Sequence, residues 1–214
     1  MSKREIISIA FVTSLLISNI LAAKLMALGP LILPAAVIIY PFCFMLGDVL
    51  TEVWGYAYAR KVIYAGFAAN MALVVFTCLG GLLPPAEVWH HQEAYLSLFG
   101  IVPRIVMASF LAYLAGELLN SWSLDRIKDI TGSRWLFVRT IGSSVVGQFV
   151  DTAIFITLAF VGTVPGPVLL TMLASQYLVK VGLEALAGTP LAYLLVGWAR
   201  SEENRADHKW MEVG

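Results

Sequence analysis

Charge is scarce in this sequence. Lys, Arg, Asp and Glu together make up 13% of the 214 residues, whereas a soluble domain usually carries about a quarter. Hydrophobic residues account for 59% of the chain, and the mean hydropathy is +0.82. This composition excludes an ordinary soluble domain and predicts an integral membrane protein.

The residues that usually support catalysis or metal binding are also few. Both cysteines, Cys43 and Cys78, lie in apolar runs, so the sequence indicates neither a disulfide framework nor a metal site. Intramembrane hydrolysis by a serine needs a general base, yet all three histidines lie outside the long apolar segments. Met45-Leu-Gly-Asp48 lacks the first glycine of the Gly-x-Gly-Asp pattern of aspartyl intramembrane proteases, and phosphate-loop and dinucleotide motifs are absent. We therefore expect a binding or transport protein rather than an enzyme, with no cofactor and no metal.

Six apolar segments are long enough to cross about 30 Å of hydrocarbon as helices. They span residues 6–27, 31–54, 62–83, 101–122, 136–161 and 168–198. A mixed aromatic and polar stretch at 86–100 is expected to lie at the membrane interface, and a charged loop is expected after the fourth span. We predict an all-α protein with one six-helix transmembrane domain over residues 1–200 and a polar tail at 201–214.

Basic residues set the orientation of such a bundle. With the amino terminus inside, nearly all of them fall on the cytoplasmic side, among them Arg60, Lys61, Arg126 and Arg139. Both termini are therefore expected to be cytoplasmic.

Polar side chains recur inside the predicted spans. Asp48 and Glu52 lie one helical turn apart, so their carboxylates share a face. The other candidates for a common cavity are Asn19, Asn70, Glu117, Asn120, Arg139, Gln148, Asp151, Gln176, Lys180 and Glu184. Each of these could instead serve helix packing through a pair along its helix or a bond between helices. Five acids against one central lysine nevertheless favour a polar cavity, because unpaired acids at membrane depth need protons, a cation or water.

The motifs of the chain resemble those of a known family. They are Gly47-Asp48-Val-Leu-Thr-Glu52-Val-Trp-Gly-Tyr56, Gly66-Phe-Ala-Ala-Asn70, Pro103-Arg104, Arg139-Thr-Ile-Gly-Ser-Ser-Val-Val-Gly-Gln148-Phe-Val-Asp151, and Lys180 with Glu184 and Thr189-Pro190. Over residues 6–200 the chain resembles the queuosine precursor transporters, a branch of the putative vitamin uptake transporters. The six-helix plan is also similar to the substrate-binding subunits of energy-coupling-factor vitamin transporters.

This resemblance implies an importer in the bacterial inner membrane. Its cargo would be 7-cyano-7-deazaguanine (preQ0) and its aminomethyl relative, used for tRNA modification, and its partners the substrate and the bilayer rather than nucleic acid. We expect Asp151 or Glu184 to accept the donor edge of the base and Lys180 or Gln148 to donate to its carbonyl, with Asp48 and Glu52 as an inner gate or proton site. A homodimer and an energising partner chain stay open, as do two alternatives: another flat heterocycle as cargo, or a membrane scaffold that transports nothing.

Overall fold

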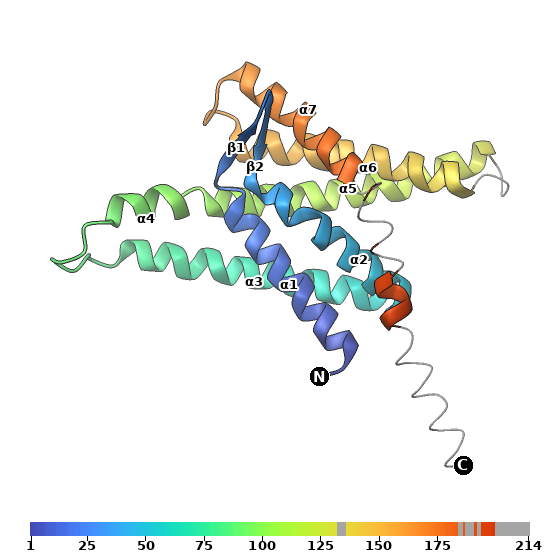
Figure 1. Ribbon diagram of the computed structural model, residues 1–214, viewed down its shortest axis with the longest axis horizontal. Coiled ribbons are helices and arrows are strands. Elements are labelled where there is room, and N and C mark those ends of the chain that lie inside the picture. Colours follow the sequence, from blue (N-terminus) through green and yellow to red (C-terminus); the bar gives the residue numbers. More distant parts are fainter. Residues whose placement is uncertain (132–135, 184–185, 187–190, 192–193, 200–214) are drawn as a thin grey trace, which may run out of the picture.

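The computed structural model describes residues 1–131, 136–183, 186, 191 and 194–199. Its elements are α1 (Lys3–Leu21), β1 (Leu25–Leu28), β2 (Leu31–Pro34), the 3₁₀ turn η1 (Ala35–Ile38), α2 (Tyr40–Trp54), α3 (Tyr56–Leu82), α4 (Gln92–Phe99), α5 (Val102–Thr131), α6 (Leu136–Phe160) and α7 (Gly166–Leu183). In Figure 1 the helices α3, α5 and α6 lie along the long axis of the molecule, and α1 and α2 cross them obliquely.

A short hairpin interrupts the helical pattern between α1 and α2. The predicted spans 6–27 and 31–54 were expected to be helical at 25–27 and 31–34, and this was wrong: β1 and β2 pair there as antiparallel strands. Gly29 adopts a positive φ of 58°, which glycine tolerates well, and lets the chain reverse. The Ala35 amide donates to the Lys24 carbonyl at 2.8 Å, closing the base of the hairpin. The strands pair only the backbone groups that face each other, but non-helical backbone is tolerated at membrane depth where protein buries it, and Leu33 and Pro34 at the end of β2 are buried.

The loop expected after the fourth span is helical instead. α5 continues through the charged residues Asp125–Asp129 and ends at Thr131. Between Trp122 and Thr131 the sequence contains neither glycine nor proline, so nothing stops the helix before Gly132. Within the 86–100 stretch, residues 92–99 form the exposed helix α4, which is tied back to α3 by a bond from the Tyr95 hydroxyl to the Thr77 carbonyl.

Two apolar cores hold the described helices together. The first lies between α1, α2 and α3, where Phe11, Leu50 and Phe67 are buried. Ala199, in the last described helical turn, also packs there, and Lys3 donates to the Trp198 carbonyl at 2.6 Å. The second core joins α5, α6 and α7 to the end of α1 and to η1, and Ile105, Ile156 and Met172 are fully buried in it.

Four stretches of the described chain are apolar and long enough to cross a membrane. They are Lys3–Leu21, Tyr56–Leu82, Gln92–Gly116 and Gly166–Leu183, and Val145–Phe160 is a shorter apolar helix. Many large apolar side chains on these helices are exposed, as expected of surfaces that face lipid. The molecule is thus a helical membrane protein with a small hairpin, while the count of six spans and the cytoplasmic position of both ends stay predictions.

Candidate substrate pocket

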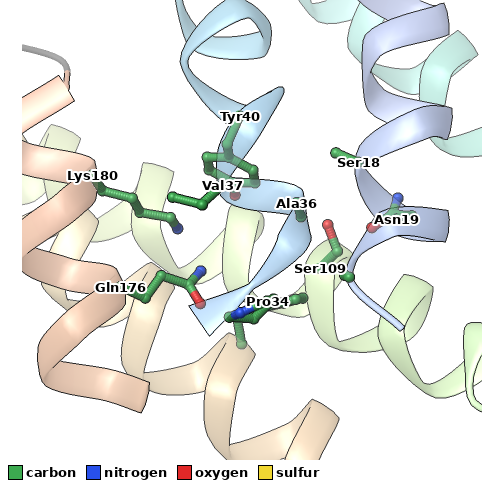
Figure 2. A pocket seen from close by; sticks show the side chains of 11 residues that line it. Ser18, Asn19, Pro34, Ala36, Val37, Tyr40, Ser109, Gln176 and Lys180 are labelled. Carbon is green, nitrogen blue, oxygen red and sulfur yellow. The ribbon is translucent and has the colours of Figure 1, made fainter. Parts of the chain in front are cut away.

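A pocket opens where α1, the hairpin, α2, α5, α6 and α7 converge. The residues that line it are Ser18, Asn19, Ala22, Pro34, Ala36, Val37, Tyr40, Ser109, Phe155, Gln176 and Lys180. Figure 2 shows Gln176 and Lys180 of α7 on one side and Ser18 and Asn19 of α1 on the other, with the segment Pro34–Tyr40 between them. The lining is therefore mixed: apolar walls carry a few polar groups at fixed places, as small-molecule sites usually do.

The pocket is narrow in this state. Its empty space, counted with the part that opens outward, is about 330 Å³. Only a water-sized molecule fits between the side chains as they lie. Binding of anything larger requires these side chains or the elements that carry them to move apart.

An ion pair joins α6 to α7 at the edge of this pocket. The Lys180 Nζ lies 2.6 Å from the Asp151 Oδ2, and the two side chains are 3% and 13% exposed. The same ammonium lies 4.2 Å from the centre of the Tyr40 ring, whose electron-rich face attracts a cation. Lys180 is thus held between a carboxylate and an aromatic ring contributed by a third element.

A glycine allows the helices around this pair to come close. A Cβ atom at Gly116 of α5 would lie 3.0 Å from the Asp151 Cβ and 3.2 Å from the Gly147 carbonyl oxygen of α6. Both distances are tighter than ordinary contacts of a Cβ atom. The missing side chain at Gly116 therefore helps set the position of Asp151.

Three buried oxygens near the ion pair have no hydrogen-bond partner among the described residues. They belong to Gln148 and Thr152 on α6 and to Gln176 on α7. Gln148 lies three residues before Asp151, on the same face of α6, and Thr152 is the next residue along the helix. Gln176 lies one turn before Lys180, is 5% exposed and lines the pocket. Because an unpaired buried acceptor is costly, these oxygens point to donors that come from a ligand or from water.

The opposite wall carries a polar contact that is complete. The Asn19 amide of α1 donates to the Asn70 Oδ1 of α3 at 2.8 Å, and the Asn70 amide donates to the Gly66 carbonyl at 2.9 Å. Asn70 is fully buried and lies behind Asn19, which is the one of the two that reaches the pocket. This pair links α1 to α3 and supports the wall.

The structure brings together some of the residues that the sequence singled out. Asn19, Asp151, Gln176 and Lys180 lie at or beside the pocket, and Gln148 lies one turn from Asp151. Glu117, Asn120, Arg139 and Glu184 lie outside the described side chains.

Asp48 and Glu52 are exposed on α2 and do not line the pocket. The reason is the rotation of the helix: Leu46 and Leu50 are buried in the first core, and Asp48 and Glu52 lie on the opposite side of α2.

Tyr40 and Ser109 are pocket residues that sequence reasoning did not find. Neither has a charged or amide side chain three or four residues away along its helix. A stripe such as Gln176 and Lys180 stands out, but an isolated tyrosine or serine does not. For metals, the described part of the chain contains no group of three His, Cys, Asp or Glu side chains that could hold an ion.

Comparison with known proteins assigns the chain to a family. The family described as "Putative vitamin uptake transporter" matches residues 34–195, which is most of the chain. The chain belongs to this vitamin uptake transporter family. The match includes α2 to α7 and therefore both members of the ion pair.

Relatives within the vitamin uptake transporter family carry a more specific name. A "Probable queuosine precursor transporter" of Bacillus subtilis (strain 168) is 35% identical over 178 residues, which cover 82% of this chain and 77% of that protein. The "Queuosine precursor transporter" of Escherichia coli (strain K12) is 29% identical over 121 residues, 56% of this chain and 52% of the relative. No solved structure matches the chain. The family and the apolar helices together identify a multi-pass membrane protein.

Proposed function

We propose that this protein imports queuosine precursors, and 7-cyano-7-deazaguanine in particular, across the bacterial inner membrane. The names of its relatives support the class of cargo. The observation that carries the proposal is the buried pair of Asp151 and Lys180 at the edge of the pocket.

The edge of a 7-deazaguanine presents three groups in a row: a carbonyl acceptor, a ring N–H donor and an amino donor. A carboxylate accepts the two donors side by side, and an ammonium donates to the carbonyl. Asp151 and Lys180 supply these two groups, one on α6 and one on α7. In our proposal the base inserts its edge between them, so that both charges stay satisfied and the pocket keeps a net charge of zero from this pair.

The surroundings of the ion pair suit such a cargo. The unpartnered oxygen of Gln176, which lines the pocket, can accept a remaining N–H group of the base. Phe155, Val37 and Tyr40 provide apolar and aromatic surface for a flat ring. Glu184 stays an alternative acceptor to Asp151, and Asp48 and Glu52 stay candidates for an inner gate or a proton site.

The test is queuosine in the tRNA of a host that cannot make 7-cyano-7-deazaguanine and lacks its own importer. Cells would carry this gene or an empty vector and receive the precursor at nanomolar concentration. We expect queuosine only in cells with the gene. If membrane-inserted protein restores no queuosine, the proposal fails for this cargo, and other flat heterocycles become the cargo to test.

A further inference from the structure

We propose that Tyr40 is a positioning residue for the cargo, whose ring holds the Lys180 ammonium in place through a cation–π contact. The inference rests on the proposed function, because the position of Lys180 matters to uptake only if this residue binds the base. It goes further by assigning a role in binding to an uncharged residue on a third helix.

The Tyr40 ring lies beside the end of the Lys180 side chain. Tyr40 is the first residue of α2 and lines the pocket, and Figure 2 shows Lys180 reaching from α7 towards its ring. The Lys180 Nζ lies 4.2 Å from the ring centre, within the range of about 6 Å over which an aromatic face attracts a cation. The ammonium therefore has two different partners: this ring and the Asp151 carboxylate 2.6 Å away.

A second aromatic ring restricts the orientation of the first. Phe44 lies one turn after Tyr40 on α2, and the two ring centres are 4.8 Å apart with their planes at 68°, an edge-to-face arrangement. The Phe44 ring centre is also 5.9 Å from the Lys180 Nζ, near the limit of the attraction. Because Leu46 and Leu50 anchor α2 in the first core, the helix presents the two rings to α7 as a fixed surface.

The Tyr40 hydroxyl makes a separate contact, because it interacts with the Asp151 carboxylate. Tyr40 thus touches both members of the ion pair, although they belong to α6 and α7. The ring and the hydroxyl can be tested independently, since phenylalanine keeps the ring and removes the hydroxyl.

Binding of the base changes the contacts of Lys180. In the proposed complex the edge of the base lies between the two charged groups, so their direct contact of 2.6 Å has to open. The attraction between the charges persists at the greater distance, but the hydrogen bond that directed the ammonium is lost. The face of the Tyr40 ring stays available and keeps the ammonium where the carbonyl of the base arrives. A cation–π contact shielded from water is strong enough to change the affinity about tenfold.

The experiment measures equilibrium binding of 7-cyano-7-deazaguanine to the purified full-length protein in lipid nanodiscs. Tyr40→Leu removes the ring and should weaken binding at least about tenfold. Tyr40→Phe should weaken binding less than Tyr40→Leu does, because the ring remains.

A fluorinated series at position 40 tests the cation–π contact itself. Fluorine atoms draw electron density from the face of a ring and weaken its attraction for a cation, while the shape of the ring hardly changes. Phenylalanines with increasing numbers of ring fluorines would replace Tyr40, and we expect the affinity for the base to fall step by step. A side chain that only fills space would give the same affinity across the series.

Tyr58 provides the matched control. The Arg4 guanidinium lies 3.7 Å from the centre of the Tyr58 ring, so this is also a cation–π pair, but neither residue lines the pocket. The same fluorinated series at position 58 should leave the affinity for the base unchanged.

The outcomes are distinguishable. A stepwise loss of affinity at position 40, with none at position 58, supports the inference. Equal affinity across the series at position 40, or the same loss at both positions, shows that the inference is wrong while the proposed function stands. If the unaltered protein does not bind the base, the proposed function fails and the inference fails with it.

Discussion

Two buried polar contacts link helices on opposite sides of the pocket, and they differ in how completely they are satisfied. Asn19 and Asn70 join α1 to α3 with neutral side chains, and the Asn70 amide also bonds to the Gly66 carbonyl. Asp151 and Lys180 join α6 to α7 with full charges, and the oxygens of Gln148, Thr152 and Gln176 nearby have no partner in the described part of the molecule. A contact whose polar groups are all hydrogen-bonded is typical of a structural role. Charges beside unpaired acceptors are typical of a ligand-binding site.

The largest effect is expected from Asp151→Asn. The amide keeps the size of the side chain but loses the charge and one acceptor, so it cannot take both donors of the base. We expect uptake per inserted protein to fall by at least about a hundredfold, consistent with the 3–5 kcal/mol typical of breaking a buried pair. Queuosine in tRNA, normalised to membrane-inserted protein on immunoblots, measures it. Undiminished uptake would show that Asp151 does not bind the cargo.

A smaller loss should follow from Gln176→Leu. This change removes the unpartnered acceptor that lines the pocket and leaves one donor of the base unpaired, so uptake should fall about tenfold. The matched control is Gln92→Leu on α4, whose amide donates to the Gly81 carbonyl far from the pocket. That variant should lose about 1 kcal/mol of stability and retain uptake. Equal losses in both variants would contradict the role of Gln176.

Gly116→Ala tests how precisely Asp151 must be positioned for its contact with Lys180. The new methyl group would lie 3.0 Å from the Asp151 Cβ, so α6 has to shift by a few tenths of an ångström. We expect a loss of uptake of about threefold to fivefold, in line with a modest overpacking cost. Gly182→Ala is the control, because a Cβ there meets nothing within 4 Å. Uptake unchanged by Gly116→Ala would mean that the position of Asp151 tolerates this shift.

The smallest effect on uptake is expected from Asn70→Ala. It leaves the Asn19 amide without its acceptor and should lower the free energy of unfolding by about 1–3 kcal/mol. Uptake per folded protein should change less than about twofold, because Asn70 lies behind the lining. Thermal unfolding in detergent and the tRNA assay measure the two quantities. A large loss of uptake at unchanged stability would contradict the purely structural role that we assign to the Asn19–Asn70 contact.

Much of the helical plan is predictable from the sequence, because the length and hydropathy of a segment identify it as a membrane helix. The hairpin is not, since Leu25–Leu28 and Leu31–Pro34 have the same apolar composition as a helix. Apolar runs of this length do not distinguish strand from helix by periodicity. Gly29-Pro30 signalled a turn, but a turn between two helices and a turn within a hairpin look alike in sequence.

The candidate site follows the same pattern. The stripe of Gln176 and Lys180 and the acid at Asp151 are visible because polar residues are expensive at membrane depth. The same reasoning gave Asp48 and Glu52 a place in the cavity, and their position on α2 shows its limit. Spacing tells which residues share a face, but only packing tells which way the face turns, and Leu46 and Leu50 decided that for α2.

The narrowness of the empty pocket has a consequence for the membrane itself. A carrier spends most of its time without cargo whenever its cargo is scarce, and an open polar cavity would then let protons and salts leak across. Here the Asp151–Lys180 pair occupies the place where the edge of a base would lie, and the walls admit only a water-sized molecule. An ion entering from the water on either side would have to shed its hydration shell to pass. Under the proposed function, the same two charges that bind the base would also keep the resting pocket closed to ions.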